Sequence, residues 1–260
     1  MTVVGLGWRT DLMLRRLAGA RITDRETHLL VRTPGNPDYR WGNFLLLPTP
    51  PPPKDAPRWI AAFAAEFPTA AHIAIGIDGP AAPDAISAFA AAGLADESHT
   101  VLTATESRRP ARPNRAAVCR PLATDADWAQ ALRLRLAVDP DPRHRRFHHR
   151  RFAEIRELCR AGHGVWFGAF LDGQPRSGLG VVTDGGGLAR FQHVETHPSY
   201  RNRGLAGTLV HHASRHALTR LGAETLVIVA DPDYLAIRVY RSLGFADHGR
   251  QIRLLRVHRG

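Results

Sequence analysis

The chain has 260 residues, 44% of them hydrophobic, so it can bury a substantial core in one large domain or two small ones. Its two cysteines, Cys119 and Cys159, form no CxxC or Cys/His cluster, which argues against a disulfide framework and a structural zinc, and we expect no bound metal. Neither a leader-like segment nor a run of 18 apolar residues occurs, so we expect a cytoplasmic protein without membrane partners.

The net charge of +11 lies entirely in the second half of the chain. Residues 1–110 carry 11 basic and 11 acidic side chains, whereas residues 111–260 carry 24 arginines against 13 acidic side chains. Such a balance favours an anionic partner, which can be a cofactor, a nucleic acid or an acidic substrate.

Hydrophobic periodicity and turn signals predict a mixed α/β pattern in the first half. Two segments look like a hairpin, and helices then alternate with strands. The predicted elements are a hairpin of Thr27–Arg32 with Trp41–Leu47, helices at Ala56–Phe67 and Pro83–Ala92, and strands at His72–Ile77 and His99–Thr105.

The arginine- and proline-rich segment Ser107–Arg115 lacks apolar periodicity and is typical of a linker. After it we expect a second mixed α/β region with the order β-α-α-β-β-β-α-β-α-β-β. Its predicted strands are Ala117–Leu122, Val165–Leu171, Gly178–Thr183, Leu188–Thr196, Thr225–Val229 and a final pair around Gly249–Val257. Its first predicted helix is capped by Thr124 or Asp125 and runs to about Val138, where Asp139–Pro142 breaks it, and a second helix extends to about Arg160. Two further helices are predicted at Gly204–Leu221 and Tyr234–Leu243.

The two halves are similar to each other at a shift of 151 residues. The shift places Phe89 on Tyr240 and aligns Ile73–Ile77 with Glu224–Ile228 without a gap. We interpret this as an internal duplication, the alternative being a chance match of two alanine-rich segments. Opposite the glycine-bearing loop of the second half, the first half has four prolines, Pro50–Pro53, which cannot donate hydrogen bonds to phosphate.

The segment Arg201–Ala206 (RNRGLA) predicts an anion site. It lies between a strand and a helix, where main-chain N–H groups lack partners and the helix dipole is positive. Gly204 permits close approach to the main chain, and Arg201 and Arg203 can neutralise phosphate. Ordinary solvated arginines at a turn are the alternative.

Two motifs together carry a family resemblance. Thr196–Ala206 (THPSYRNRGLA) after a strand, and Asp233–Phe245 (DYLAIRVYRSLGF) one strand later, resemble the two signatures of the GNAT superfamily of acyl-CoA N-acyltransferases. The resemblance covers about residues 116–260. It implies a GNAT-like mixed central sheet flanked by helices, with residues 1–110 as a degenerate copy of the same α/β (α+β) fold and residues 111–115 ending the linker.

By this resemblance, acetyl-CoA would be the co-substrate, transferring its acetyl group to a primary amine by direct attack in a ternary complex. Its pyrophosphate would lie on the loop and first helical turn, and its pantetheine beside the strand end like an added strand. The implied cofactor-binding residues are Val194, Glu195, Thr196, Arg201, Asn202, Arg203, Gly204, Leu205, Ala206, Gly207, Thr208, Asp233 and Tyr240.

The resemblance also implies that Tyr240 protonates the departing thiolate, with a core tyrosine as the alternative. Asp233 stands where the family usually has a cofactor-contacting Asn, and it can equally cap the following helix. The general base stays open. Glu195 is the first candidate, followed by His193 and Gln192, and a solvent-exposed or salt-bridged glutamate is the alternative for Glu195. Alternation along the strand places Glu195 and His193 on one face and Gln192 on the other.

The basic run Arg143–Arg151 (RHRRFHHRR) leaves three interpretations open: a solvated helix face, a nucleic-acid contact, or selection of an acidic acceptor. A nucleic-acid partner is not what we expect. The alternative function is a non-catalytic CoA-binding or nucleic-acid-binding regulator on the same fold. The chain is expected to be a monomer or a homodimer.

Overall fold

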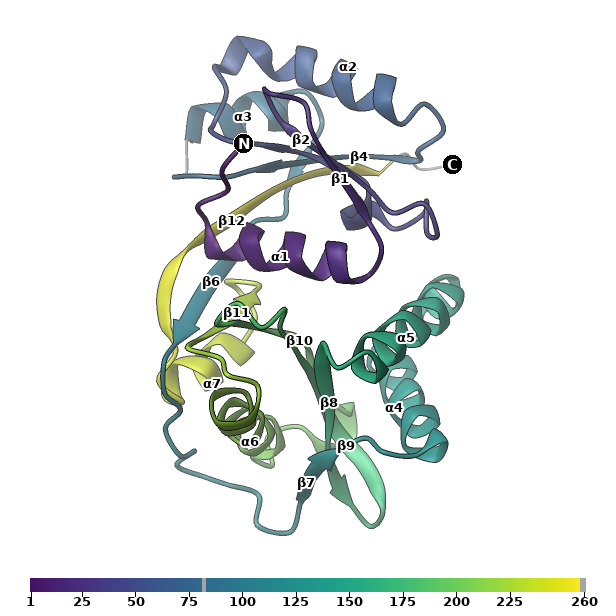
Figure 1. The fold of residues 1–260 in the computed structure, drawn as a ribbon, viewed down its shortest axis with the longest axis vertical. Helices are drawn as coiled ribbons and strands as arrows, with labels where there is room; N and C mark the ends of the chain where they lie inside the picture. The colour runs from purple at the N-terminus through teal and green to yellow at the C-terminus, as the bar shows by residue number, and fades with distance from the viewer. Residues whose placement is uncertain (81–82, 258–260) are drawn as a thin grey trace. The chain divides into compact units, whose positions relative to one another are not determined.

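Residues 1–80 and 83–257 are described by the computed structural model, and their contacts divide into two compact units. Unit 1 comprises the described residues of 1–101 together with 229–232 and 248–257; unit 2 comprises residues 102–228 and 233–247. Figure 1 traces the elements of each unit in chain order.

Unit 1 is a mixed sheet with helices on both faces. Its strands are β1 (Arg21–Asp24), β2 (Leu29–Arg32), β3 (Phe44–Leu47), β4 (His72–Ile77), β5 (Ala95–Asp96) and all but the first two residues of β12 (Ala246–Val257). Its helices are α1 (Leu6–Leu17), α2 (Ala56–Glu66) and α3 (Pro83–Ala91). Strands β1 to β3 pair antiparallel, β3 pairs parallel with β4, and β4 pairs antiparallel with β12.

Helix α1 was not predicted from the sequence, and its contacts in the structure hold it in place. Trp8 places its indole ring over Gly76, where a Cβ atom would be 2.5 Å away, and its Nε1 donates to the carbonyl of Ile77 at 2.9 Å. The helix also buries an Asp11–Arg15 ion pair of 3.1 Å, with Arg15 lying over the ring of Tyr39. These polar residues hide the apolar face that periodicity would otherwise reveal.

Unit 2 is a sheet with the strand order β7-β8-β9-β10-β11. Its strands are β7 (Val118–Pro121), β8 (Gly164–Leu171), β9 (Gln174–Val182), β10 (Leu188–Thr196) and β11 (Thr225–Ala230), and its helices are α4 (Asp125–Val138), α5 (Arg145–Arg160), α6 (Leu205–Arg220) and α7 (Ala236–Ser242). Strand β6 (His99–Ala104) and the end of β11 lie where the two units divide.

Helices cover both faces of the sheet in unit 2. Trp166 of β8 packs against Phe152 and Ile155 of α5 on one face, whereas the next residue, Phe167, meets His212 and His216 of α6 on the other. Figure 1 shows the same division, with α4 and α5 on one side of β8 to β10 and α6 on the other.

Local signals explain most of these boundaries. An Asp-Gly turn, a common hairpin signal, joins β8 to β9, and both Asp172 and Gly173 have positive φ, as a tight hairpin requires. Helix α4 begins with a capping box in which Thr124 and Asp127 satisfy each other's main-chain N–H groups.

The units differ from the predicted domains 1–110 and 116–260 in three places. The first segment of unit 1 ends at Val101, and residues 229–232 also belong to this unit. Most of the last strand belongs to unit 1 as well, because Ile252–Val257 pair with His72–Ile77 of β4. The final strand pair predicted around Gly249–Val257 is also wrong, since residues 246–257 form one strand. The linker Ser107–Arg115 belongs to unit 2.

The two halves share a β-α-β arrangement. Parallel strands β3 and β4 are joined through α2, and parallel strands β10 and β11 are joined through α6. Helix α3 follows β4 as α7 follows β11, and Phe89 is buried as Tyr240 is. This correspondence supports the predicted duplication, which stays a prediction.

Candidate active site

The predicted anion loop forms a sharp turn between β10 and α6. His197 begins it by accepting a hydrogen bond from the Ser199 N–H at 3.2 Å, as expected of a turn residue. Asn202 (φ 61°) and Gly204 (φ 74°) both have left-handed backbone, and α6 begins directly afterwards at Leu205. The turn therefore leaves the first main-chain N–H groups of a 16-residue helix without intrahelical acceptors.

Side chains around this turn divide into anchors and exposed cations. Leu205 and Gly207 are buried, and the Thr208 hydroxyl donates to the carbonyl of Gly204 at 2.8 Å. Arg201 and Arg203 are exposed, and the Arg203 guanidinium lies over the ring of Tyr200. The loop thus combines helix amides that lack intrahelical acceptors with exposed positive charge, the combination that binds phosphate.

The strand before the loop has an open edge. The ladder between β10 and β11 includes only Leu188–Arg190 paired with Thr225–Val227, so Phe191–Thr196 have no ladder partner on that edge among the described residues. A bulge between Gln192 and Glu195 also interrupts pairing with β9, and His193 there has φ 49°. The main chain of β10 is therefore available to an extended ligand just before the anion loop.

Glu195 is the buried end of a polar network. Only 7% of the residue is exposed, and its Oε2 accepts a hydrogen bond from the Arg135 guanidinium at 2.8 Å. Its Oε1 has no hydrogen-bond partner among the residues described. Burial raises the pKa of the Glu195 carboxyl to about 7, although Arg135 opposes the shift.

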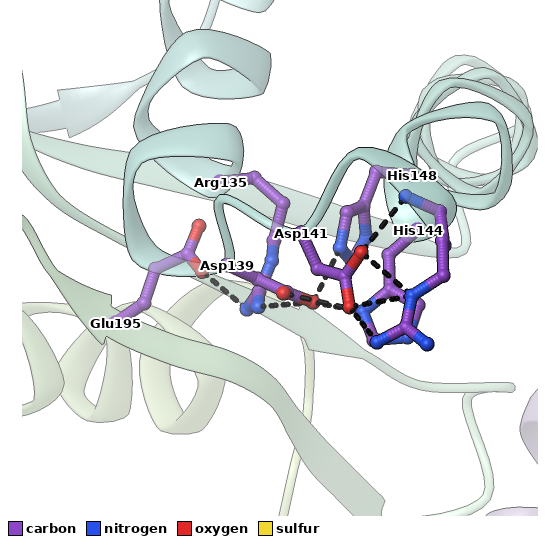
Figure 2. A network of polar contacts seen from close by, with 7 residues as sticks. Arg135, Asp139, Asp141, His144, His148 and Glu195 are labelled. Carbon is purple, nitrogen blue, oxygen red and sulfur yellow. Dashed lines mark hydrogen bonds and ion pairs between the residues drawn. The ribbon is translucent and has the colours of Figure 1, made fainter.

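Arg135 connects Glu195 to a second carboxylate, as Figure 2 shows. Its guanidinium lies 3.5 Å from Oδ2 of Asp139, and that carboxylate also contacts His148 at 2.8 Å and His144 at 3.1 Å. Asp139, His144 and His148 bring three metal-type ligand atoms within 4.8 Å of one another. The Arg135 guanidinium already places a positive charge at the same carboxylate.

The predicted shared face of Glu195 and His193 agrees with their contacts. Glu195 meets Arg135 of α4, and the His193 ring lies 5.9 Å from that of Trp166, whose own contacts are with α4 and α5. Both base candidates therefore face the α4–α5 side of the sheet.

The comparisons with known proteins agree with this geometry. The model of the acetyltransferase (GNAT) family matches residues 128–245, from α4 to the end of the second signature. Residues 128–245 form a GNAT-family domain. This domain contains the anion loop, the open edge of β10 and the network of Figure 2.

Solved structures resemble the chain well beyond the GNAT domain. A conserved protein of unknown function from Staphylococcus epidermidis has a TM-score of 0.75 at 12% identity, covering 92% of this chain and 95% of that one. A GCN5-related N-acetyltransferase from Kribbella flavida has a TM-score of 0.69 at 17% identity, covering 99% and 97%.

A tandem GNAT protein from the clavulanic acid biosynthesis pathway has a TM-score of 0.58 at 16% identity, covering 95% of this chain and 88% of that one. The TM-scores and coverage show a shared fold, and at identities this low they show the fold alone. Among curated proteins, none matches the sequence significantly. Within the described residues, none of the helices has the length and apolar character needed to cross a membrane.

Tyr240 of the GNAT domain is buried on α7, with 5% of the residue exposed. Burial raises the pKa of its phenol well above the usual range, so the hydroxyl keeps its proton at neutral pH. The Tyr240 hydroxyl therefore meets the requirement for a proton donor.

Asp233 is not the N-cap residue of α7. The helix begins at Ala236 and its N-cap residue is Leu235, because the turn 232–235 delays the helix by two residues relative to the prediction. Asp233 itself is exposed.

The basic run is only partly a solvated face. His148 and Arg151 are both buried, His148 against Asp139 and Arg151 in an ion pair with Glu154. Sequence analysis missed the partners Arg135 and Asp139. The four-residue spacing of His144 and His148, after an aspartate, was the available signal, since that spacing places both on one helix face.

Proposed function

We propose that the protein is an N-acetyltransferase that transfers the acetyl group of acetyl-CoA to a primary amine by direct attack in a ternary complex. The observation that carries this proposal is the open edge of β10 at Phe191–Thr196, which leads directly into the anion loop. One extended ligand with a peptide-like arm and a pyrophosphate fits both features at once.

In this proposal the pantetheine amides pair with the main chain at Val194–Thr196. The pyrophosphate lies on Arg201–Thr208, with the first-turn N–H groups as donors and Arg201 and Arg203 as cations. The Glu195 carbonyl already accepts from the Ser177 hydroxyl at 2.6 Å, which holds the bulged strand in position. Asp233 lies before α7, near enough in sequence to Tyr240 to border the same ligand.

Glu195 is the proposed general base. An ammonium acceptor loses one proton to become a nucleophile and a second when its nitrogen becomes an amide. A carboxylate with a pKa near 7 can accept such a proton at neutral pH, and its Oε1 is not engaged by Arg135. His193 lies on the same face and is the second candidate.

Tyr240 is the proposed acid. The amine nitrogen attacks the thioester carbonyl carbon, the C–S bond breaks when the tetrahedral intermediate collapses, and the Tyr240 proton passes to the departing sulfur. The raised pKa of the Tyr240 phenol keeps this proton in place until the thiolate forms. The phenolate is reprotonated from solvent before the next turnover.

Calorimetric titration with acetyl-CoA, followed by a thiol-release assay over a panel of primary amines, tests the proposal. Saturable binding together with amine-dependent release of CoA is expected. Binding without release on any amine would favour a CoA-binding regulator. Absence of binding would contradict both, and salt-sensitive binding to RNA or DNA would then favour the nucleic-acid alternative.

A matched pair of variants links binding to the loop. Arg201→Gln removes a cation beside the expected pyrophosphate, just before α6 begins. Arg220→Gln removes an exposed arginine at the opposite, C-terminal end of α6. Only the first should weaken acetyl-CoA binding, by about three- to tenfold for an exposed charge-assisted contact. Equal effects would contradict the placement of the pyrophosphate.

A further inference from the structure

The linker Ser107–Arg115, here called the strap, is hydrogen-bonded to α7 and α6. The Arg108 N–H donates to the carbonyl of Leu243 at the end of α7 at 2.8 Å. The Ser107 hydroxyl lies 3.1 Å from Nδ1 of His211, in the second turn of α6. A segment with the composition of a flexible linker is therefore held by specific contacts within unit 2.

The strap then crosses the first turn of α6. The Asn114 N–H donates to the Thr208 hydroxyl, and its side-chain amide donates to the carbonyl of Arg203, both at 2.9 Å. The Asn114 side-chain oxygen accepts from the N–H groups of Ala116 and Ala117, which fixes the turn after it. Asn114 thus attaches the strap to the anion loop on both sides of Gly204.

Glycines of α6 make room for the strap. The Arg112 carbonyl lies 2.3 Å from where a Cβ atom on Gly204 would be. At Gly207 the corresponding position is 3.5 Å from Pro110 and 3.6 Å from Val239 of α7. The strap therefore lies where α6 and α7 approach each other, beside the proposed pyrophosphate site.

Four arginines of the strap are exposed: Arg108, Arg109, Arg112 and Arg115. None of them has an ion-pair partner in the part of the chain that the structure describes. The strap contains no acidic residue, and Arg201 and Arg203 on the loop add to the same positive region. The positive charge of the strap and the loop together exceeds what a pyrophosphate needs, because Arg201 and Arg203 alone match the two negative charges of a pyrophosphate.

We propose that the strap is part of the cofactor site and that its arginines bind the 3′-phosphate of the CoA ribose, so that the enzyme selects 3′-phosphorylated CoA. The inference rests on the proposed function. Coenzyme A differs from simpler pantetheine nucleotides by this dianion on the adenosine end. The strap supplies uncompensated guanidinium groups beside the loop, and its anchored main chain reduces the entropy lost when they bind.

The test compares CoA with 3′-dephospho-CoA by calorimetry on the full chain. The variants are the strap pairs Arg108→Gln/Arg109→Gln and Arg112→Gln/Arg115→Gln, with Arg220→Gln as the control. We expect the wild-type protein to bind CoA about tenfold or more tightly than 3′-dephospho-CoA. At least one strap pair should reduce this ratio toward one while binding of 3′-dephospho-CoA changes by less than about threefold.

A strap that acts only as a structural element would change both affinities together and leave their ratio unchanged, which would overturn the inference. Tighter CoA binding by a strap variant would also overturn it, because the strap would then be an obstacle. A wild-type ratio of one would overturn this inference alone, whereas failure of the wild type to bind either nucleotide would overturn the proposed function as well. If the same two arginines are replaced by lysine and the ratio of affinities for CoA and 3′-dephospho-CoA returns to the wild-type value, the result supports the role of charge.

Discussion

The main-chain carbonyl of Arg112 lies against Gly204, 2.3 Å from where a Cβ atom on that glycine would stand. Gly204 also has φ 74°, so two separate constraints select glycine there. Sequence analysis attributed the glycine to close approach of a ligand. In the structure the atoms that approach this side of Gly204 belong to the chain itself, so changes at Gly204 disturb the strap as well as the loop.

Gly204→Ala is expected to destabilise unit 2 and to weaken CoA binding. A left-handed backbone costs a non-glycine residue about 1–2 kcal/mol, and the new Cβ would collide with main-chain atoms that cannot rotate away. Urea unfolding and CoA calorimetry measure the two effects.

Gly222→Ala is the matched control. Gly222 also has positive φ, at 66°, but no atom lies within 4 Å of its Cβ position. Gly222→Ala should lower the free energy of unfolding only by the cost of a left-handed backbone, and it should leave CoA binding unchanged. Equal losses of stability in the two variants would contradict a role for the Arg112 contact.

Tyr240→Phe is expected to lower kcat by about 10²-fold or more, the usual contribution of a positioned general acid. The KM for acetyl-CoA should change little, because the ring still fills the buried position on α7. Steady-state kinetics separates the two constants. The control is Tyr234→Phe, which alters an exposed tyrosine six residues earlier and should be silent. Full activity of Tyr240→Phe would remove Tyr240 from the mechanism.

The pH dependence of kcat/KM should show a limb that rises to a plateau with an apparent pKa near 7. Below that pH the Glu195 carboxyl is protonated and cannot accept a proton from the amine. Glu195→Gln should lose this limb and about 10²-fold in rate. Glu224→Gln, which changes an exposed glutamate of unit 2, should keep both. A limb that survives in Glu195→Gln would assign it to another group, with His193 next to be tested.

Stability should depend on the same carboxyl. The pKa of Glu195 in the folded protein is raised from 4.5 to about 7, so burial favours its protonated form. The stability that this group contributes is present below about pH 4.5 and is lost as pH rises through about 7. The free energy of unfolding of Glu195→Gln should therefore improve relative to the wild type between pH 5 and pH 8. If the difference in free energy of unfolding between Glu195→Gln and the wild type did not change over this pH range, Arg135 would compensate fully for the burial of the Glu195 carboxylate.

Thr124→Ala should destabilise the protein by about 1 kcal/mol, the typical cost of losing an N-cap. The Asp127 N–H loses its acceptor, a bond of 3.1 Å, although Asp127 keeps its ion pair with Arg120. Thr124→Ser retains the hydroxyl and should remain within about 0.5 kcal/mol of the wild type in urea unfolding. Equal losses in both variants would show that the threonine methyl group, and not the cap, is responsible.

The anion loop and its helix could be predicted because their signals are local. A strand end, a left-handed glycine, flanking arginines and a helical run occur within about 30 consecutive residues, so no distant contact was needed to recognise them. The Asp172-Gly173 hairpin and the Thr124 cap were predictable for the same reason. Helix α1 was not, since Trp8 finds its place only against Gly76.

The charge network of the site could not be derived from sequence. Arg135 and Glu195 are 60 residues apart, and nothing in either local pattern predicts their 2.8 Å hydrogen bond. The raised pKa of Glu195 depends on burial, which arises only when β10 packs against other elements, α4 among them. Strand β12 was misassigned in a similar way, because its partner β4 lies about 180 residues earlier in the chain.

By itself, the sequence determined the helix that follows the loop, the Asp172-Gly173 turn and the Thr124 cap, and it predicted a phosphate-binding loop in the second half. Each of these depends on residue types at short spacing. Only the tertiary structure decided that the final strand completes the first unit, that Glu195 is paired with Arg135, and that the strap covers the first turn of α6. Each of these depends on contacts between distant segments, whose free energy appears only when the chain packs.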